Sequence, residues 1–145
     1  MMKPCREKYY RFLFTVSAIY DTGLGIIFTF FSRQAFQMLG IADKLPAFGG
    51  YISLLGAFLF VIGVAYFLIA RGDLRRNLDL ILVGVLYKLT YCATAFSYFA
   101  IGDVPHIIFV SLFGVADFIF LVFMIECFLF LKKTASVQPM QAGNQ

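Results

Sequence analysis

The segment from Pro105 to Leu131 constrains the fold more than any other part of the sequence, because it is an almost unbroken apolar run. An α-helix needs about 20 apolar residues to cross the hydrocarbon core of a bilayer, and this run is longer. A carboxylic acid, Asp117, lies near its middle. An ionisable group at that depth is unfavourable unless it is paired, and such groups often mark functional sites. The segment therefore predicts a transmembrane helix with an unusual residue at its centre.

The composition agrees with a protein embedded in lipid. Of the 145 residues, 61% are hydrophobic and only 14% are charged, whereas about a quarter of a soluble domain is charged. The formal charge of +4 does not indicate nucleic-acid binding, because the basic residues stand at the ends of apolar runs, where membrane topology explains them. We therefore expect the lipid bilayer, and no nucleic acid, among the partners.

Four apolar runs predict an all-α bundle of four transmembrane helices, forming one domain over residues 1–133. The tail, residues 134–145, is polar and is expected to be disordered. Residues 32–48 separate the first two spans and form either a short interfacial helix or an ordinary loop. The predicted spans are Phe12–Phe31, Tyr51–Ala70, Leu78–Phe99 and Pro105–Leu131.

The basic residues predict the orientation. Nine of the twelve Lys and Arg residues fall at the two chain ends and in the loop 71–77. Only Arg33 and Lys44 fall on the other side, and the remaining one, Lys88, lies inside a span. Cytoplasmic loops of membrane proteins are enriched in Lys and Arg, so both termini are expected in the cytoplasm of a multi-pass protein.

Three charged residues are predicted to meet at the middle of the bilayer. At a rise of about 1.5 Å per residue, Asp21, Lys88 and Asp117 reach similar depths in three different helices. Two acids and one base leave one surplus negative charge, which favours a proton on one of the acids. One interpretation is a functional site, either a proton relay or the polar floor of a ligand pocket.

The alternative interpretation is a structural clamp that fixes helix register. Lys88 then pairs with one acid, and the other acid is protonated or bonded to a hydroxyl. The candidate hydroxyl groups belong to Ser17, Thr22, Tyr87 and Tyr91.

Further polar residues are candidates for accessory roles. His106 is eleven residues, close to three α-helical turns, before Asp117, so it is placed on the same face near the outer end. It is either the entry of a proton path or an ordinary interfacial histidine. Glu126 is placed on nearly the opposite side of that helix from Asp117. It either pairs with Tyr66, reaches the headgroups or faces another subunit.

The sequence offers no familiar catalytic or metal-binding pattern. It contains one histidine, and it has no Walker loop, GxSxG or HExxH motif. Cys5, Cys92 and Cys127 lack metal-site spacing and are expected to be free thiols. We therefore expect no metal and no evident cofactor, with a quinone or a lipid as the remaining ligand classes. A non-enzymatic role is favoured over an enzymatic one.

Five segments carry a resemblance to a known family. They are YDTGLGIIFTFF, LGI, LLGAFLFVIGVAYFLIARGDLRRN, GVLYKL and ADFIFLVFMIECFL. Together they resemble small four-helix bacterial inner-membrane proteins of the DoxX-like kind. The resemblance extends over residues 12–131 and implies a bundle in the inner membrane with a partner in a membrane redox complex. It transfers no catalytic residue.

Three functional hypotheses remain open at this point. The first is a non-enzymatic subunit of a membrane complex, quinone-linked in the case of a redox complex, or a binder of a small hydrophobic ligand. The second is a proton-coupled transporter or channel component, which requires a homo-oligomer because four helices are few for a solute path. The third is a membrane enzyme that acts on a quinone or a lipid.

Overall fold

The computed structural model describes residues 4–137, with side chains described for residues 5–134. The described chain is helical apart from short connections. Its elements are α1 (Pro4–Phe30), α2 (Ser32–Met38), η1 (Ala42–Lys44), α3 (Gly50–Arg71), α4 (Leu78–Ile101), α5 (Ile107–Phe109), the π-helical segment η2 (Val110–Ala116) and α6 (Asp117–Val137).

Four of the helical stretches are long and apolar enough to cross a membrane, which confirms the predicted fold class. Their outward surfaces are also apolar. Ile19 on α1, Val61 on α3 and Phe118 on α6 are all more than half exposed. Large apolar side chains at such a density on an outer surface suit contact with lipid tails rather than water. The stretches are Cys5–Phe30, Gly50–Arg71, Leu78–Ile101 and Ile107–Thr134.

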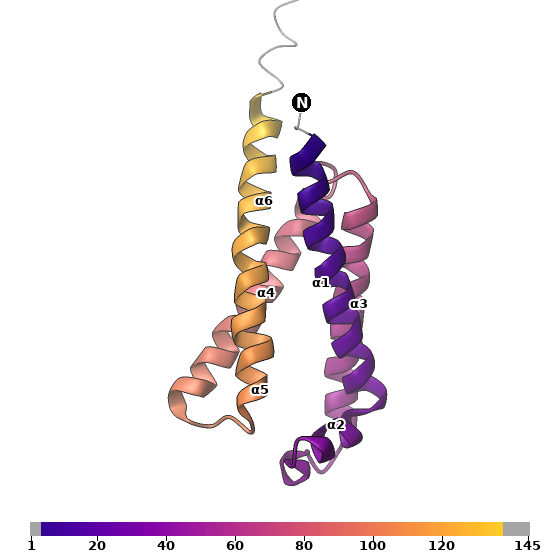
Figure 1. Ribbon diagram of the computed structural model, residues 1–145, viewed down its shortest axis with the longest axis vertical. Helices are drawn as coiled ribbons and strands as arrows, with labels where there is room; N and C mark the ends of the chain where they lie inside the picture. Colours follow the sequence, from indigo (N-terminus) through magenta and orange to yellow (C-terminus); the bar gives the residue numbers. More distant parts are fainter. Residues whose placement is uncertain (1–3, 138–145) are drawn as a thin grey trace, which may run out of the picture.

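The bundle consists of two helix pairs (Figure 1). Helix α1 packs along α3, and α4 packs against the continuous stretch formed by η2 and α6. The start of α1 and the end of α6 lie at the same end of the bundle, while α2 lies at the opposite end (Figure 1). Four spans bring the two ends of the described chain to the same side, as the predicted topology requires.

Glycines allow α1 and α3 to approach closely. A Cβ atom added to Gly56 would lie 2.5 Å from the Thr29 backbone nitrogen, and one added to Gly63 would lie 2.6 Å from that of Thr22. These distances leave no room for a side chain. Small residues permit such contact between membrane helices, which gain little from burying apolar surface in lipid. Gly49 lies seven residues before Gly56, but a Cβ atom added to it would meet nothing within 4 Å, so it takes no part in this contact.

Some element boundaries differ from those predicted. Helix α1 starts at Pro4, so the basic segment before Phe12 is helical. Pro105 was placed in the first turn of the fourth span, but the helix starts at Ile107, because the extended His106 accepts a hydrogen bond from the Ile108 amide and caps it. Helix α6 continues to Val137, into the predicted tail; residues 138–145 lie outside the described part.

A short helix does occupy the segment between the first two spans. Phe36 of α2 is buried in an apolar cluster with Phe28, Ile41, Leu59 and Phe113 at that end of the bundle. A larger apolar cluster, which includes Phe14, Tyr66 and Met124, fills the half nearer the chain termini. The charged residues of the bundle centre lie between these two clusters along the helices.

Candidate functional site

The three midplane charges form one ion-paired cluster, here called the charged triad: Asp21, Lys88 and Asp117. Lys88 Nζ donates hydrogen bonds to Asp21 Oδ1 at 2.8 Å and to Asp117 Oδ1 at 2.7 Å. All three side chains are at most 1% exposed. The prediction that Lys88 lies within ion-pair reach of Asp21, Asp117 or both is therefore confirmed, and it reaches both.

Four aromatic rings surround the ammonium group of Lys88. Its Nζ lies between 5.2 and 5.8 Å from the centroids of these rings. A cation near ring faces gains energy from the ring quadrupole, and the gain is larger where water is excluded. The rings therefore stabilise the lysine in its buried position without competing for the carboxylates. They belong to Tyr20, Tyr66, Tyr87 and Phe120.

Each carboxylate of the triad retains one unbonded oxygen. Asp21 Oδ2 and Asp117 Oδ2 are buried and have no hydrogen-bond partner among the described residues. The clamp interpretation paired Lys88 with one acid and left the other protonated or bonded to a hydroxyl. Lys88 instead reaches both acids, and among the described residues no hydroxyl donates to either. Ser17, for example, donates to the Leu13 carbonyl of its own helix instead. A buried polar atom without a partner is unfavourable, so the triad is stabilised chiefly through Lys88.

The triad also connects the two helix pairs. Asp21 belongs to α1, Lys88 to α4, and Asp117 is the first residue of α6. The Lys88–Asp21 bond therefore joins the α1/α3 pair to the α4/α6 pair, while the Lys88–Asp117 bond lies within the second pair. This arrangement fixes the position of one pair relative to the other at the level of the bundle centre.

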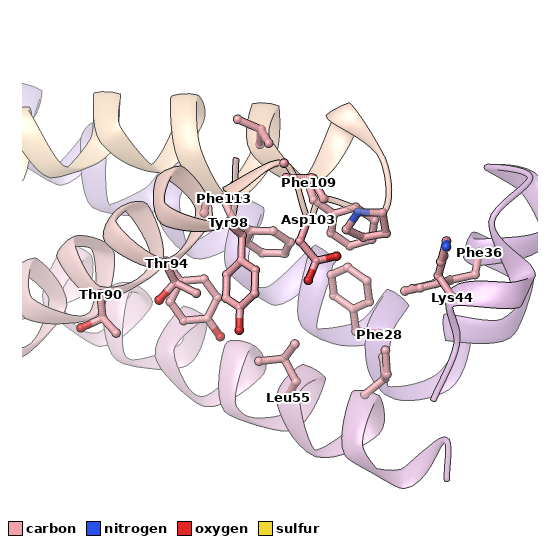
Figure 2. A pocket seen from close by; sticks show the side chains of 17 residues that line it. Phe28, Phe36, Lys44, Leu55, Thr90, Thr94, Tyr98, Asp103, Phe109 and Phe113 are labelled. Carbon is pink, nitrogen blue, oxygen red and sulfur yellow. The ribbon is translucent and has the colours of Figure 1, made fainter. Parts of the chain in front are cut away.

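A cleft opens between the helix pairs on the α2 side of the triad (Figure 2). Its volume is about 750 Å³, within the range of about 300–1,000 Å³ typical of small-molecule sites. Leu55 of α3 and Thr94 of α4 both line it and remain exposed, so the cleft opens sideways to the outer surface of the bundle. Six aromatic side chains line it: Phe28, Phe36, Tyr91, Tyr98, Phe109 and Phe113.

Two tyrosines lie between the cleft and the triad. The Tyr91 ring lines the cleft, and its centroid is 4.6 Å from that of Tyr87. The Tyr87 ring in turn lies 5.7 Å from Lys88 Nζ. Tyr91 was predicted as an accessory polar residue, a candidate hydroxyl partner of the acids. It lines the cleft, whereas the acids do not. The apolar cleft and the charged triad are therefore neighbours in the bundle.

Glu126 takes part in a separate cluster. Its Oε1 accepts hydrogen bonds from Arg6 Nη2 at 2.7 Å and from the Tyr10 hydroxyl at 3.0 Å. Glu126 therefore binds residues of α1, whereas Asp117 binds Lys88 of α4. The suggested pairing with Tyr66 is wrong, because the Tyr66 hydroxyl donates to the Gly84 carbonyl. Glu126 therefore joins α6 to the start of α1 near the chain termini.

His106 has a structural contact of its own. Its Nδ1 accepts from the Ile108 amide and caps the helix that follows. The calculation that placed it on the face of Asp117 assumed a regular α-helix. The intervening segment Val110–Ala116 is π-helical, with more residues per turn, so that calculation does not apply. A helix cap accounts for His106 without a proton path.

The remaining chemistry-bearing groups do not gather into a metal site. No group of three or more His, Cys, Asp or Glu side chains lies together within the described residues. The three cysteines are free thiols, as predicted, with Cys5 exposed and Cys92 and Cys127 buried.

The sequence-based interpretation missed the cleft, although one signal for it was present. Thr90, Thr94 and Tyr98 recur every four residues and all line the cleft on α4. Side chains four residues apart share a helix face, so this spacing marks a polar stripe in an apolar span. The pattern did not reveal which other helices would face the stripe.

Comparisons with known proteins do not assign the chain to a family. No protein-family model matches the chain, and no characterised protein and no solved structure matches it either.

Proposed function

We propose that this protein is a non-enzymatic membrane protein that binds a small hydrophobic ligand in the cleft between its helix pairs. The cleft carries the proposal: an aromatic-lined hollow of about 750 Å³ beside a buried polar cluster. Ligand sites are typically concave and mostly apolar, with a few polar groups that fix orientation. Here Tyr91, Thr94 and Tyr98 supply such groups.

The triad supports this function by holding the cleft open. Two helix pairs that packed on one another over their full length would leave no hollow. The bond between Lys88 and Asp21 joins the pairs at the bundle centre, below the cleft. The aromatic residues Phe28 and Phe113, with centroids 5.9 Å apart, then close the inner side. In this view the triad joins the helix pairs just beyond the inner end of the cleft, and Tyr87 and Tyr91 separate it from the ligand.

The proposal includes a location. The asymmetric distribution of Lys and Arg supports cytoplasmic termini, and the resemblance to DoxX-like proteins supports the bacterial inner membrane and a membrane complex as the setting. Under this orientation the cleft belongs to the outer leaflet, because Phe36 of α2 and Lys44 of η1 line it. Helix α2 lies at the end of the bundle opposite the start of α1 (Figure 1).

A dye-binding titration tests the proposed function. The purified protein in nanodiscs is titrated with N-phenyl-1-naphthylamine, a neutral dye whose fluorescence rises in apolar surroundings, and empty nanodiscs give the lipid background. We expect one saturable component. Ala95→Phe fills the cleft and should abolish this component, as should Thr94→Phe at a more exposed lining position. Ala93→Phe, on an exposed position outside the lining, is the matched control and should leave it intact.

Either of two results would contradict the proposed function. The first is the absence of any saturable component with the folded wild-type protein. The second is equal binding by all three phenylalanine variants, which would place the dye elsewhere on the bundle.

A further inference from the structure

We infer that the ligand of the cleft is a single-chain amphiphile with a zwitterionic headgroup that carries a phosphate and a primary ammonium group. This inference rests on the proposed function and specifies its ligand class. It follows from the length of the cleft, from its apolar inner wall and from two charged residues at the end nearest α2, here called the mouth.

The length of the cleft matches one hydrocarbon chain. Along α4 the lining runs from Thr90 to Tyr98, which at about 1.5 Å per residue is roughly 12 Å. One leaflet of a bilayer has a hydrocarbon depth of about 15 Å, half of the whole core. A chain that lies parallel to α4 therefore spans most of one leaflet inside the cleft. The sideways opening beside Leu55 and Thr94 gives such a chain a route from the surrounding lipid.

The inner wall along this length is apolar and faces the polar stripe on α4. Phe28, Phe109 and Phe113 form the inner wall, with ring centroids 5.9 to 6.5 Å apart. An alkyl chain against these rings replaces lipid contacts with protein contacts. Thr90 and Tyr91 line the end of the cleft nearest the bundle centre, and the alkyl chain ends beside them.

Charges of both signs stand at the mouth. Lys44 of η1 and Asp103 of the loop after α4 line the same cleft as the aromatic wall. Figure 2 shows Asp103 and Lys44 among the side chains that line the cleft. Gly102, with φ +81°, ends α4 in the left-handed conformation and directs the chain into this loop.

The two charges select the headgroup by complementarity. A phosphate pairs with an ammonium donor, and a primary ammonium group donates to a carboxylate. Lys44 Nζ lies 3.6 Å from Asp43 Oδ2, but both side chains are more than half exposed and such a pair is weak, so Lys44 can bind a phosphate. A headgroup of one charge would pair with Lys44 or Asp103 and bring a like charge into the cleft that the other lines.

Competition between amphiphiles of one chain length tests the headgroup. The bound dye is displaced by alkyl phosphoethanolamine, alkyl carboxylate, alkylamine and alkyl maltoside, all below their micelle concentrations. We expect the phosphoethanolamine to displace the dye at a concentration at least about 10-fold lower than the maltoside does, a difference of about 1.4 kcal/mol. Asp103→Asn and Lys44→Gln should each reduce this preference several-fold, whereas the control Arg33→Gln, outside the lining, should retain it.

The outcomes separate this inference from the proposed function. Equal displacement by all four amphiphiles would overturn the headgroup assignment and leave the proposed ligand site standing. A preference for the carboxylate or the amine alone would overturn it as well. A preference that survives both Asp103→Asn and Lys44→Gln would place the headgroup elsewhere. The absence of a saturable dye component would instead refute the proposed function.

Discussion

Replacing Lys88 by methionine removes the one cation that both buried carboxylates share. Methionine retains most of the lysine's volume, so packing changes little while two hydrogen bonds of 2.7 and 2.8 Å are lost. Asp21 and Asp117 are then buried without any partner at their Oδ1 or Oδ2 atoms. Breaking a buried ion pair by removing one partner costs about 3–5 kcal/mol. For a chain of this size that corresponds to a melting temperature roughly 6–20 °C lower.

Removing the acids as well should reverse much of this loss. Adding Asp117→Asn to Lys88→Met leaves one unpaired carboxylate instead of two, so part of the stability should return. The triple variant with Asp21→Asn has no buried charge left and should come within about 2 kcal/mol of the wild type, because neutral replacement of a buried charged cluster is often tolerated. Lys132→Met, at an exposed position, is the control and should change stability by less than about 0.5 kcal/mol.

The buried cysteines provide the assay. The chain has no Trp, but Cys92 and Cys127 are at most 3% exposed and become reactive when the bundle unfolds. A thiol-reactive dye added during heating in detergent therefore reports unfolding, once the exposed Cys5 has been replaced by serine. Losses that simply add from the single to the double and triple variants would refute the reasoning, because they would mean that the three charges do not share one site.

Three further predictions concern other contacts. Gly56→Ala should destabilise the protein by about 1–3 kcal/mol in the same thermal assay, because the added Cβ meets backbone atoms. Gly23→Ala, whose Cβ meets nothing within 4 Å, should be neutral or stabilising. Equal effects of the two substitutions would refute the close approach of α1 and α3. Glu126→Gln should cost less than about 1 kcal/mol, because the ion pair with Arg6 is exposed, and a loss above 3 kcal/mol would contradict this. A cysteine at Ala42 should react with a membrane-impermeant reagent in intact cells and one at Lys133 should not; the reverse labelling would invert the orientation.

The sequence was sufficient to predict the triad because depth in a membrane helix depends on few variables. A fixed rise per residue places Asp21, Lys88 and Asp117 at one level, and the low dielectric of lipid leaves a buried charge few alternatives to pairing. Which of the two acids Lys88 binds could not be predicted. Whether Lys88 reaches one acid or both depends on the rotation of three helices about their axes, which apolar sequence alone does not determine.

The cleft could not be predicted for a related reason. Gly56 and Gly63 bring α1 close to α3, and the cleft lies between that pair and α4, but no sequence pattern indicates how the two pairs are spaced. The π-helical segment at Val110–Ala116 also changes which side chains face the bundle, and no residue in it signals this change. Similarly, the partner of Glu126 was missed because the basic segment before Phe12 was not expected to extend α1.

The central claim is that the cleft holds a ligand. Native mass spectrometry tests it most directly, on protein extracted from the membranes of cells that express it. We predict one small hydrophobic molecule bound to each wild-type chain and to each Ala93→Phe chain, and its loss from Ala95→Phe and Thr94→Phe, all four proteins unfolding normally in the thiol assay. The same bound mass on all four proteins, or no bound molecule on the folded wild type, would contradict the account.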